Sequence, residues 1–501
     1  MKNKTGVCRA LLLVGMGLMI PCYLFTAGNT LLSPWPLYDR NRLALCLLTP
    51  LCLLLLLLLG RAAKAKVFET HERAVLLGFA AFYFVIQLVM ASALRFTPVT
   101  DLEQCVTAAR RLAQTGAFGD SERSLIYFGR YPHNMGLVYL LAGIFKAADA
   151  LGADELMAAA LVCGLLFSMG LLCAARLCRR LGGAQAQARA LLLFATCLPF
   201  LYCTSELYTD AFSVAFAPMI VFAFLKARDA GSRKERALWA LLFAVCTFFG
   251  AQIRFPTIIA AIACLIAALF EKRAKLTALL AAPLALVFAV GGSAVNAANK
   301  ANLGAANIAQ NKLPKLHYIA MGLPVQSDEG YGQYGYGGWL IFSTSFDDPQ
   351  ARDEALRQEV VDRAYTLAHH PAQLLSTLSR KNLSTFGRGT FNLNEIFEAD
   401  AHEADNAVKQ AVFENGRFNR AYTHLATAIF VAQMALACIA CIQAIRRRDT
   451  RAAPLFLTLL GAFLFLSIWE TRARYFFQFM MILLCAGAMF ETPSTHAAQK
   501  A

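Results

Sequence analysis

The sequence predicts an all-α polytopic membrane protein, and three observations carry that prediction. The chain has 501 residues, of which 58% are hydrophobic and only 16% are charged, whereas soluble domains carry about 25% charged residues. Apolar runs recur along the whole chain, and a run of roughly 20 residues is long enough to cross a bilayer. Short clusters of lysine and arginine separate many of these runs. A soluble globular domain is therefore excluded.

About 12 transmembrane helices are expected from the apolar runs. The first run follows a basic start and has no small-residue cleavage site, so we interpret it as a retained span. The run at residues 134–150 is short and carries Lys146 and Asp149 near its end, so we expect a helix in the plane of the outer surface. The expected spans begin near Cys8, Leu43, Ala74, Glu155, Ala188, Ala211, Ala237, Pro256, Leu276, Tyr422, Pro454 and Ala473.

The basic residues predict the orientation of these spans. The net charge of +15 does not indicate nucleic-acid binding, because the basic residues lie in short clusters between spans. Such clusters mark cytoplasmic loops, so both termini are expected in the cytoplasm and the chain in the plasma membrane. The clusters occupy residues 2–9, 61–73, 176–189, 226–236, 272–275 and 446–451.

Four regions follow from this topology. Residues 1–94 are N-terminal transmembrane helices, and 95–294 form a transmembrane core whose first outer loop is 95–154. Residues 295–421 form a mostly helical extracytoplasmic region, and 422–501 are C-terminal transmembrane helices. In the third region, helical spacing of Leu356, Val360 and Leu367 predicts one helix, and Pro371 opens another. The Gly/Tyr-rich residues 330–339 are expected to form an aromatic loop.

Two carboxylates at the start of the first outer loop are candidates for chemistry. Asp101 and Glu103 follow an expected span directly, and an acid at this boundary can act as a general base. The alternative is structural, because Thr100 or Asp101 also fits the N-cap of the following helix. On a helix the two acids face away from each other, since two residues correspond to roughly 200° of rotation.

Further outward-facing groups occur later in the chain. Residues 130–136 read RYPHNMG, which fits either a helix start at Pro132 or a binding segment. The SELYTDAF stretch carries Glu206 and Asp210, which fit either solvated loop acids or a site. Arg254 and Arg474 fit either snorkelling to lipid phosphates or bidentate binding of a substrate phosphate. Glu470 and Arg474 are four residues apart, so an ion pair on one helix face is also compatible.

Neither the cysteines nor any known catalytic motif indicates a different chemistry. Most of the 15 cysteines lie in apolar runs, where they serve as small packing residues, and only Cys105 is expected in a loop. The sequence has no metal-ligand spacing, P-loop, GxSxG or HExxH motif. A divalent metal is therefore compatible with the chain but not implied by it.

The order of these motifs resembles the GT-C class of polytopic membrane glycosyltransferases, which includes the protein O-mannosyltransferase-like enzymes. Within that class the chain is most similar to integral membrane members from Gram-positive bacteria. The chain departs from the class in having three expected spans, rather than one, before the first outer loop. It also has Phe255 inserted between Arg254 and Pro256. The matching residues are Asp101; Tyr131, Pro132, His133, Asn134 and Gly136; Tyr208 to Asp210; Arg254; His317 to Leu323; Lys381, Gly389 and Thr390; and Glu470, Arg474 and Tyr475.

The resemblance implies an inverting glycosyltransferase with an extracytoplasmic active site. It implies a sugar on a polyprenyl phosphate as donor and a cell-envelope glycan, glycolipid or protein as acceptor, within the lipid bilayer. Asp101 would be the catalytic base. The implied substrate-binding residues are Glu103, Arg130, Tyr131, His133, Asn134, Asp210, Arg254, His317, Lys381, Glu470, Arg474 and Tyr475. The alternative is a transporter or flippase of lipid-linked glycans, which would use the arginines but need no base.

Overall fold

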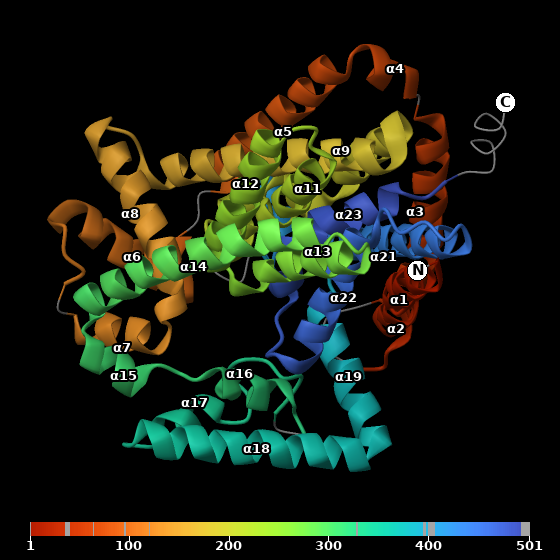
Figure 1. The fold of residues 1–501 in the computed structure, drawn as a ribbon. Coiled ribbons are helices and arrows are strands. Elements are labelled where there is room, and N and C mark those ends of the chain that lie inside the picture. The colour runs from red at the N-terminus through yellow and green to blue at the C-terminus, as the bar shows by residue number, and fades with distance from the viewer. Residues whose placement is uncertain are drawn as a thin grey trace.

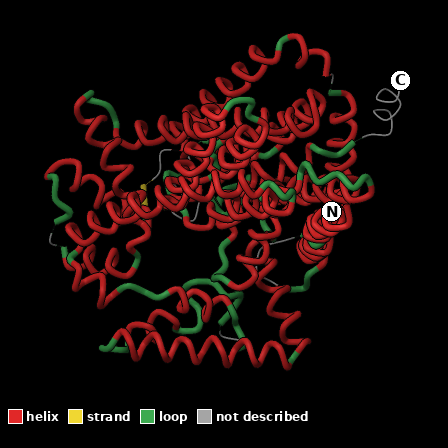
Figure 2. Tube along the Cα trace, in the orientation of Figure 1, coloured by secondary structure: helices red, strands yellow, loops and turns green. Residues whose placement is uncertain are grey.

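A computed structural model describes residues 2–35, 41–63, 65–94, 97–119, 121–326, 329–393, 397–398 and 406–491. Within these ranges the chain is almost entirely helical (Figures 1 and 2). One strand pair occurs there, in which β1 (Thr97–Pro98) runs antiparallel to β2 (Phe397–Glu398). The expected all-helical membrane architecture is confirmed.

The N-terminal region is a set of apolar helices with lipid-facing surfaces. Leu43, Leu47 and Leu51 of α3 are 70%, 59% and 61% exposed, and their spacing of four residues places them on one helix face. Such a continuous exposed leucine face fits contact with a bilayer. The helices are α1 (Lys2–Gly17), α2 (Met19–Leu32), α3 (Arg42–Ala62), α4 (Ala65–Thr70) and α5 (Glu72–Leu94).

The next segment forms a small helical layer at one end of the bundle, on the left of Figure 1. It comprises α6 (Thr100–Thr115), α7 (Glu122–Arg130), the 3₁₀ turn η1 (Pro132–Asn134) and α8 (Met135–Ala150). Helix α8 packs on α6 and on α9. Cys105 is buried within α6, which lies between the candidate spans Glu72–Leu94 and Glu155–Thr196, in the loop where it was expected. Residues 95–96, at the start of the expected outer loop, lie outside the described part of the chain.

Long apolar helices build the centre of the molecule. Helix α9 (Glu155–Thr196) has a kink at Gly183, where φ is 74°, a value that glycine adopts easily. Helices α11, α5 and α23 pack against it. The other central elements are η2 (Leu198–Leu201), η3 (Cys203–Ser205), α10 (Thr209–Ser213), α11 (Phe216–Asp229), α12 (Arg233–Ile253), η4 (Phe255–Thr257), α13 (Ile258–Phe270) and α14 (Ala274–Leu303).

A second helical layer lies below the bundle in Figure 1. It contains α15 (Ala305–Asn311), α16 (Lys315–Gly322), α17 (Trp339–Thr344), α18 (Pro349–His369) and α19 (Pro371–Phe386), and α20 (Ala407–Val412) follows in the chain. The predicted helix around Leu356 and the helix start at Pro371 are confirmed as α18 and α19. Between α16 and α17 the Gly/Tyr-rich segment forms turns, as expected for an aromatic loop.

The chain ends by returning into the bundle. Helices α21 (Asn419–Arg446), α22 (Ala453–Ile468) and α23 (Met480–Ala488) pack against α3, α13 and α9 respectively. Between α22 and α23 the chain leaves the helical path and then forms η6 (Ala473–Phe479). This interruption brings residues 469–475 toward the lower layer.

Eight helices in the described residues are long and apolar enough to cross a membrane. The expected spans near Glu155 and Ala188 are one kinked element of 42 residues. The expected spans near Pro256, Pro454 and Ala473 form shorter helices of 10–17 residues, and 17 residues at 1.5 Å each reach about 26 Å. The count of about 12 therefore stays a prediction.

Candidate functional site

The candidate site is centred on a buried carboxylate held by two arginines. The Asp210 side chain is fully buried. Its Oδ1 lies 3.0 Å from Nε of Arg254, and its Oδ2 lies 3.4 Å from Nε of Arg474. The buried anion attracts both cations strongly, because charges interact more strongly away from water. Asp210 therefore holds the two guanidinium groups in defined positions.

Local breaks in helical structure bring these three residues together. Asp210 lies in the first turn of the short helix α10. Arg254 follows the last residue of α12 in an extended conformation, with φ of −149°, and its NH1 donates to Thr209 Oγ1 at 2.8 Å. Arg474 lies in η6, just after the non-helical segment 469–472.

Asp101 lies at the accessible edge of this cluster. Its side chain is 41% exposed, and its Oδ2 lies 3.9 Å from NH2 of Arg474. The hydroxyl of Tyr127 donates to Asp101 Oδ1 at 2.8 Å, and that of Tyr208 lies 3.5 Å from Oδ2. The carboxylate is thereby fixed on one side and open on the other.

The N-cap interpretation of Thr100 and Asp101 was wrong. Helix α6 begins at Thr100, its N-cap residue is Val99, and that cap makes no side-chain hydrogen bond. Thr100 and Leu207 both have left-handed backbone angles, with φ of 53° and 49°. Such angles cost on the order of 1–3 kcal/mol in non-glycine residues, and here they adjoin Asp101 and Tyr208.

Asn134 connects the two tyrosines that contact Asp101. Its Nδ2 donates to the Tyr127 hydroxyl at 2.9 Å, and its Oδ1 lies 3.5 Å from the Tyr208 hydroxyl. Asn134 is held in place by the close approach of Gly136 to α12. A Cβ atom at Gly136 would lie 2.2 Å from the main-chain oxygen of Gln252, so only glycine fits there.

Glu470 and Tyr475 lie behind the arginines. The Tyr475 hydroxyl donates to Glu470, and the guanidinium of Arg254 lies 4.3 Å from the centre of the Tyr475 ring. Burial raises the pKa of the Glu470 carboxyl. The ion pair that helical spacing predicted between Glu470 and Arg474 does not form on one helix face, because α22 ends at Ile468 and η6 begins at Ala473.

Aromatic side chains form a wall beside the cluster. The Tyr131 hydroxyl lies 2.9 Å from that of Tyr334, which comes from the Gly/Tyr-rich loop. His133 is exposed and meets the rings of Tyr131 and Tyr318 edge-on. Tyr318 stacks on Trp469 with ring centres 5.1 Å apart. Aromatic faces of this kind can contact the apolar face of a sugar ring.

Four further predicted site residues lie at other positions in the fold. Glu103 is exposed on α6. The main-chain oxygen of Arg130 accepts from Leu313 N at 3.3 Å, which ties α7 to the segment before α16. His317 is buried, and its Nδ1 lies 2.7 Å from Ser343 Oγ. A role of these residues in binding stays a prediction.

The fourth is Lys381, a buried cation on α19. Its Nζ donates to the main-chain oxygen of Trp469 at 2.8 Å and to that of Gly322. Burial lowers its pKa to about 7, while the charge of Glu470 opposes that effect. Lys381 therefore joins α19 to the segment that carries Glu470 and Arg474.

Two groups in the cluster were not predicted in these roles. Tyr127 has no motif of its own, and only its position four residues before Tyr131 could have indicated a shared helix face. Glu206 was weighed as a solvated loop acid, but its side chain is 1% exposed. Burial and the charge of Asp210 raise its pKa well above the usual range.

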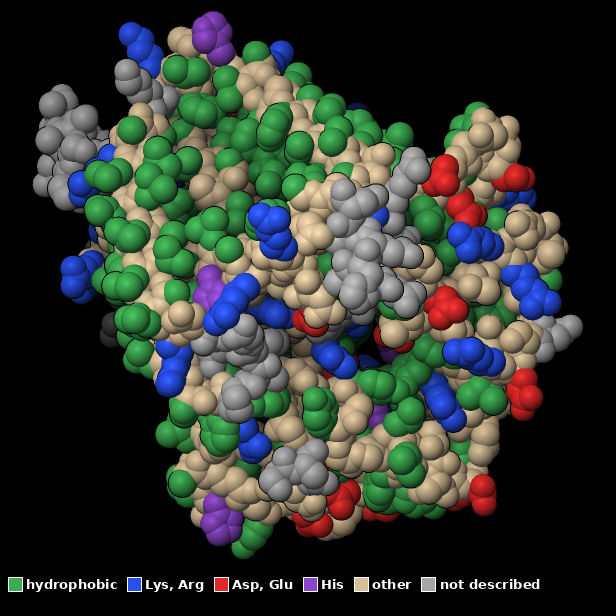
Figure 3. Space-filling model, turned by 180° about the vertical axis from the view of Figure 1, so that it is seen from behind, with side chains coloured by type: hydrophobic (Ala, Val, Ile, Leu, Met, Phe, Trp, Pro, Cys, Tyr) green, Lys and Arg blue, Asp and Glu red, His purple; other side chains and the backbone are tan. Residues whose placement is uncertain are grey.

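The surface near the lower layer is hollowed. Figure 3 shows a recess between the helix bundle and that layer, with basic, acidic and histidine side chains around it. In the described ranges no group of three His, Cys, Asp or Glu side chains is placed to hold a metal ion.

These features define the chain as a helical integral membrane protein with a buried charged cluster. Residues 371–495 match the model of a family described as "conserved hypothetical integral membrane protein". This match spans α19 to α23 and so includes Lys381, Glu470 and Arg474. No curated protein matches the chain. No solved structure matches it either.

Proposed function

We propose that this protein is an inverting glycosyltransferase that moves a sugar from a polyprenyl-phosphate donor to an extracytoplasmic acceptor. One observation carries the proposal: the half-exposed Asp101 carboxylate faces Arg474, which together with Arg254 contacts the buried Asp210. In this proposal Asp101 is the general base and the two arginines bind the phosphate, an arrangement that suits one displacement at a sugar carbon bound to phosphate.

In the proposed reaction Asp101 accepts a proton from the acceptor hydroxyl. The acceptor oxygen attacks the anomeric carbon as its bond to the phosphate oxygen breaks, and the phosphate leaves with the bonding electrons. One such displacement inverts the anomeric centre. A positioned base of this kind contributes typically 10²–10⁴-fold.

Arg474 and Arg254 would stabilise the charge that develops on the leaving phosphate. Their guanidinium groups are already oriented by Asp210 and by the rings of Tyr208 and Tyr475. Donors that are oriented before the reaction need no reorganisation as charge develops. Tyr127 and Asn134 would hold the Asp101 carboxylate in position through their hydrogen bonds.

The site is proposed to face the extracytoplasmic side of the plasma membrane, with both termini cytoplasmic. The basic clusters between the apolar runs support this orientation. Cysteine labelling from outside should reach a cysteine engineered at Gly330 and should miss one at Arg447. Labelling of Arg447 from outside would contradict the orientation. Asp400, a second expected outer position, lies outside the described residues.

A transfer assay tests the function. Purified protein in lipid nanodiscs would be incubated with radiolabelled prenyl-phosphate sugars and a cell-envelope acceptor extract. We expect label in the acceptor fraction and release of prenyl phosphate in equal amounts. The rival transporter function predicts a different result: no transfer in nanodiscs, but movement of the labelled lipid across the bilayer of reconstituted vesicles.

A further inference from the structure

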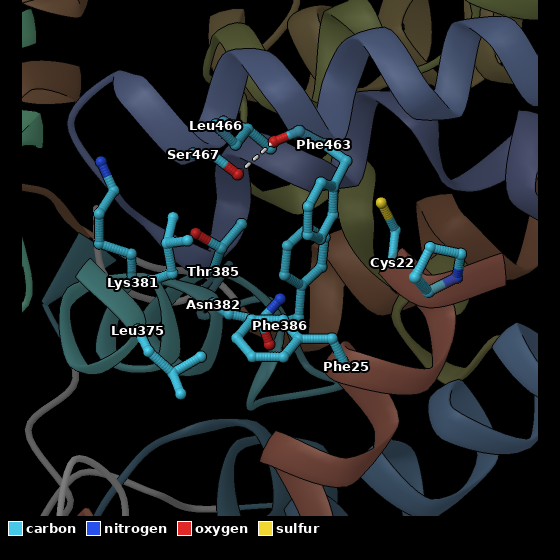
Figure 4. A pocket seen from close by; sticks show the side chains of 12 residues that line it. Cys22, Phe25, Leu375, Lys381, Asn382, Thr385, Phe386, Phe463, Leu466 and Ser467 are labelled. Carbon is cyan, nitrogen blue, oxygen red and sulfur yellow. Dashed lines mark hydrogen bonds between the residues drawn. The ribbon is translucent and has the colours of Figure 1, made fainter. Parts of the chain in front are cut away.

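A cavity of about 320 Å³ lies between α2, α19 and α22. Apolar side chains from all three helices line it, among them Phe25, Leu375 and Phe463. Figure 4 shows these helices around a common space, with the amine of Lys381 pointing away from Cys22 and Phe25. Only the aliphatic part of that lysine therefore borders the cavity, and the volume falls at the lower end of the range of about 300–1,000 Å³ for ligand sites.

Hydrogen bonds hold two walls of the cavity at a fixed separation. Asn382 Nδ2 on α19 donates to Thr26 Oγ1 on α2 at 2.8 Å. One turn further along α2, Asn29 Nδ2 donates to the main-chain oxygen of Ser379 at 2.7 Å. Separating α2 from α19 would break these hydrogen bonds, so the two walls are fixed relative to each other.

The cavity is accessible from the bilayer. Helix α2 belongs to the candidate membrane span Gly6–Leu32. Pro21 and Leu375, which border the cavity, are both exposed. The opening therefore lies where α2 meets lipid, so the natural occupant is a hydrocarbon chain rather than a water-soluble molecule.

One side of the cavity borders the segment that carries part of the charged cluster. The stem of Lys381 lines the cavity, and its Nζ donates to the main-chain oxygen of Trp469 at 2.8 Å. Trp469 directly precedes Glu470, and Arg474 follows in η6. A chain in the cavity can therefore end near this segment.

We infer that this cavity holds a segment of the prenyl chain of the lipid-phosphate donor, with its phosphate directed toward Arg474 and Arg254. The inference rests on the proposed function for the identity of the donor. Helix α2 forms one wall of the cavity, so the N-terminal helices would take part in donor binding. A chain that moves from bilayer to cavity gains little from the hydrophobic effect, because lipid is equally apolar. The cavity would therefore act by shape and by positioning the phosphate.

Photo-crosslinking tests the site without requiring activity. The probe is a prenyl phosphate of eleven isoprene units with a diazirine in the isoprene units nearest the phosphate, added to the full-length protein in nanodiscs. We expect adducts in peptides from α2 and α19, suppressed by unlabelled prenyl phosphate but not by dioleoyl phosphatidate. Suppression by both lipids would show a general acyl-chain site and overturn the inference. Adducts only on the exposed face of α3 would also overturn it.

Matched substitutions test the same cavity during turnover. Cys22→Trp fills it, whereas Leu24→Trp adds the same ring on the 64% exposed face of α2. The readout is a ratio: kcat/KM for a long-chain donor divided by kcat/KM for a ten-carbon donor. We expect Cys22→Trp to lower this ratio about tenfold, because overpacking of the cavity excludes the longer chain. Leu24→Trp should leave the ratio unchanged, and Cys22→Leu should give a smaller fall.

The two sets of results separate the inference from the proposed function. Adducts in α2 and α19 without any sugar transfer would retain the cavity and reject the reaction. A different result would support the reaction but not the cavity as the prenyl site. In that case sugar is transferred, Cys22→Trp leaves the chain-length ratio unchanged, and the adducts lie elsewhere in the protein.

Discussion

Two buried carboxylate–arginine groups in this protein differ in how far they are open to solvent. In the lower layer, Glu329 and Arg363 are 4% and 6% exposed and lie 2.5 Å apart. Arg363 also donates to Leu323 O at 3.1 Å, and Glu329 accepts from the main-chain N–H groups of Val325 and Gln326. In the bundle, the buried Asp210 meets two arginines, and one of these also faces the half-exposed Asp101.

This difference distinguishes an ion pair that stabilises the fold from a candidate ligand-binding site. Arg363 also contacts Glu359 at 3.1 Å, and the Trp339 ring covers its guanidinium at 4.4 Å. In the Asp210 cluster the neighbouring acid, Asp101, is 41% exposed. A closed ion pair can only stabilise the fold, whereas a cluster that is open on one side can contact a ligand. The predictions below test this distinction.

The largest expected effect is on stability, at the closed pair. Arg363→Gln leaves the Glu329 carboxylate buried without its partner, which costs about 3–5 kcal/mol. The melting temperature in detergent should fall sharply. Arg357→Gln on the same helix is the control. Its pair with Glu354 is 68–70% exposed, so its loss should cost no more than about 1 kcal/mol. Equal effects of the two variants would contradict the structural role of Arg363.

The next effect is on donor use, at the open cluster. Arg474→Gln removes one of the two proposed phosphate contacts but leaves Arg254 3.0 Å from Asp210, so the fold should be largely retained. A charge-assisted hydrogen bond is worth about 1.5–3 kcal/mol, so kcat/KM for the donor should fall roughly tenfold or more. Arg254→Gln should act in the same direction. If both variants use donor normally, the arginines serve only the fold or the lipid interface.

Lys381 is a third buried charged group, and it donates hydrogen bonds to two main-chain carbonyls. Its pKa of about 7 in the folded protein lies below the value of about 10.4 in an unfolded chain. Between pH 7 and 10 the unfolded state therefore binds more protons, and this group makes the free energy of unfolding rise with pH. The slope should approach about 1.4 kcal/mol per pH unit. Lys381→Met should remove that slope in melts from pH 7 to 9, and an unchanged slope would show that another group causes it.

The smallest expected effect is at the tyrosine that positions Asp101. Tyr127→Phe removes one hydrogen bond to Asp101 and one from Asn134. The bond to Asp101 contributes about 0.5–1.5 kcal/mol, so kcat should fall roughly 2- to 10-fold with little change in donor KM. Tyr365→Phe, at a ring that is 64% exposed on α18, is the control. A change in KM alone would show that Tyr127 contacts substrate instead.

Parts of this arrangement could be predicted from the sequence. The apolar runs gave the positions of most long helices, and Leu356 and Pro371 gave α18 and α19, because periodicity and helix-start preferences are local signals. The motif order also selected Asp101, Asn134, Asp210, Arg254 and Arg474, which the structure brings together. Their distances could not be predicted, because they depend on breaks in helical structure at residues 207, 254 and 469–472.

Other features depend on tertiary contacts with no local signal. Glu206 looks like a loop acid, and only packing around it shows that it is buried. Lys381 and His317 appeared in motifs beside the arginines, but their partners are main-chain oxygens and Ser343. The hydrogen bond of Tyr127 to Asp101 joins residues 26 positions apart, which no helical spacing anticipates.

Replacement of Asp101 tests the central claim most directly. Asp101→Asn preserves the size of the side chain and an oxygen that accepts from Tyr127, so fold and donor binding should be retained. Loss of the base should reduce the rate of sugar transfer by about 10² or more. The matched control is Glu103→Gln on the exposed face of α6, which should change the rate little. An Asp101→Asn protein that transfers sugar at the normal rate would contradict the account.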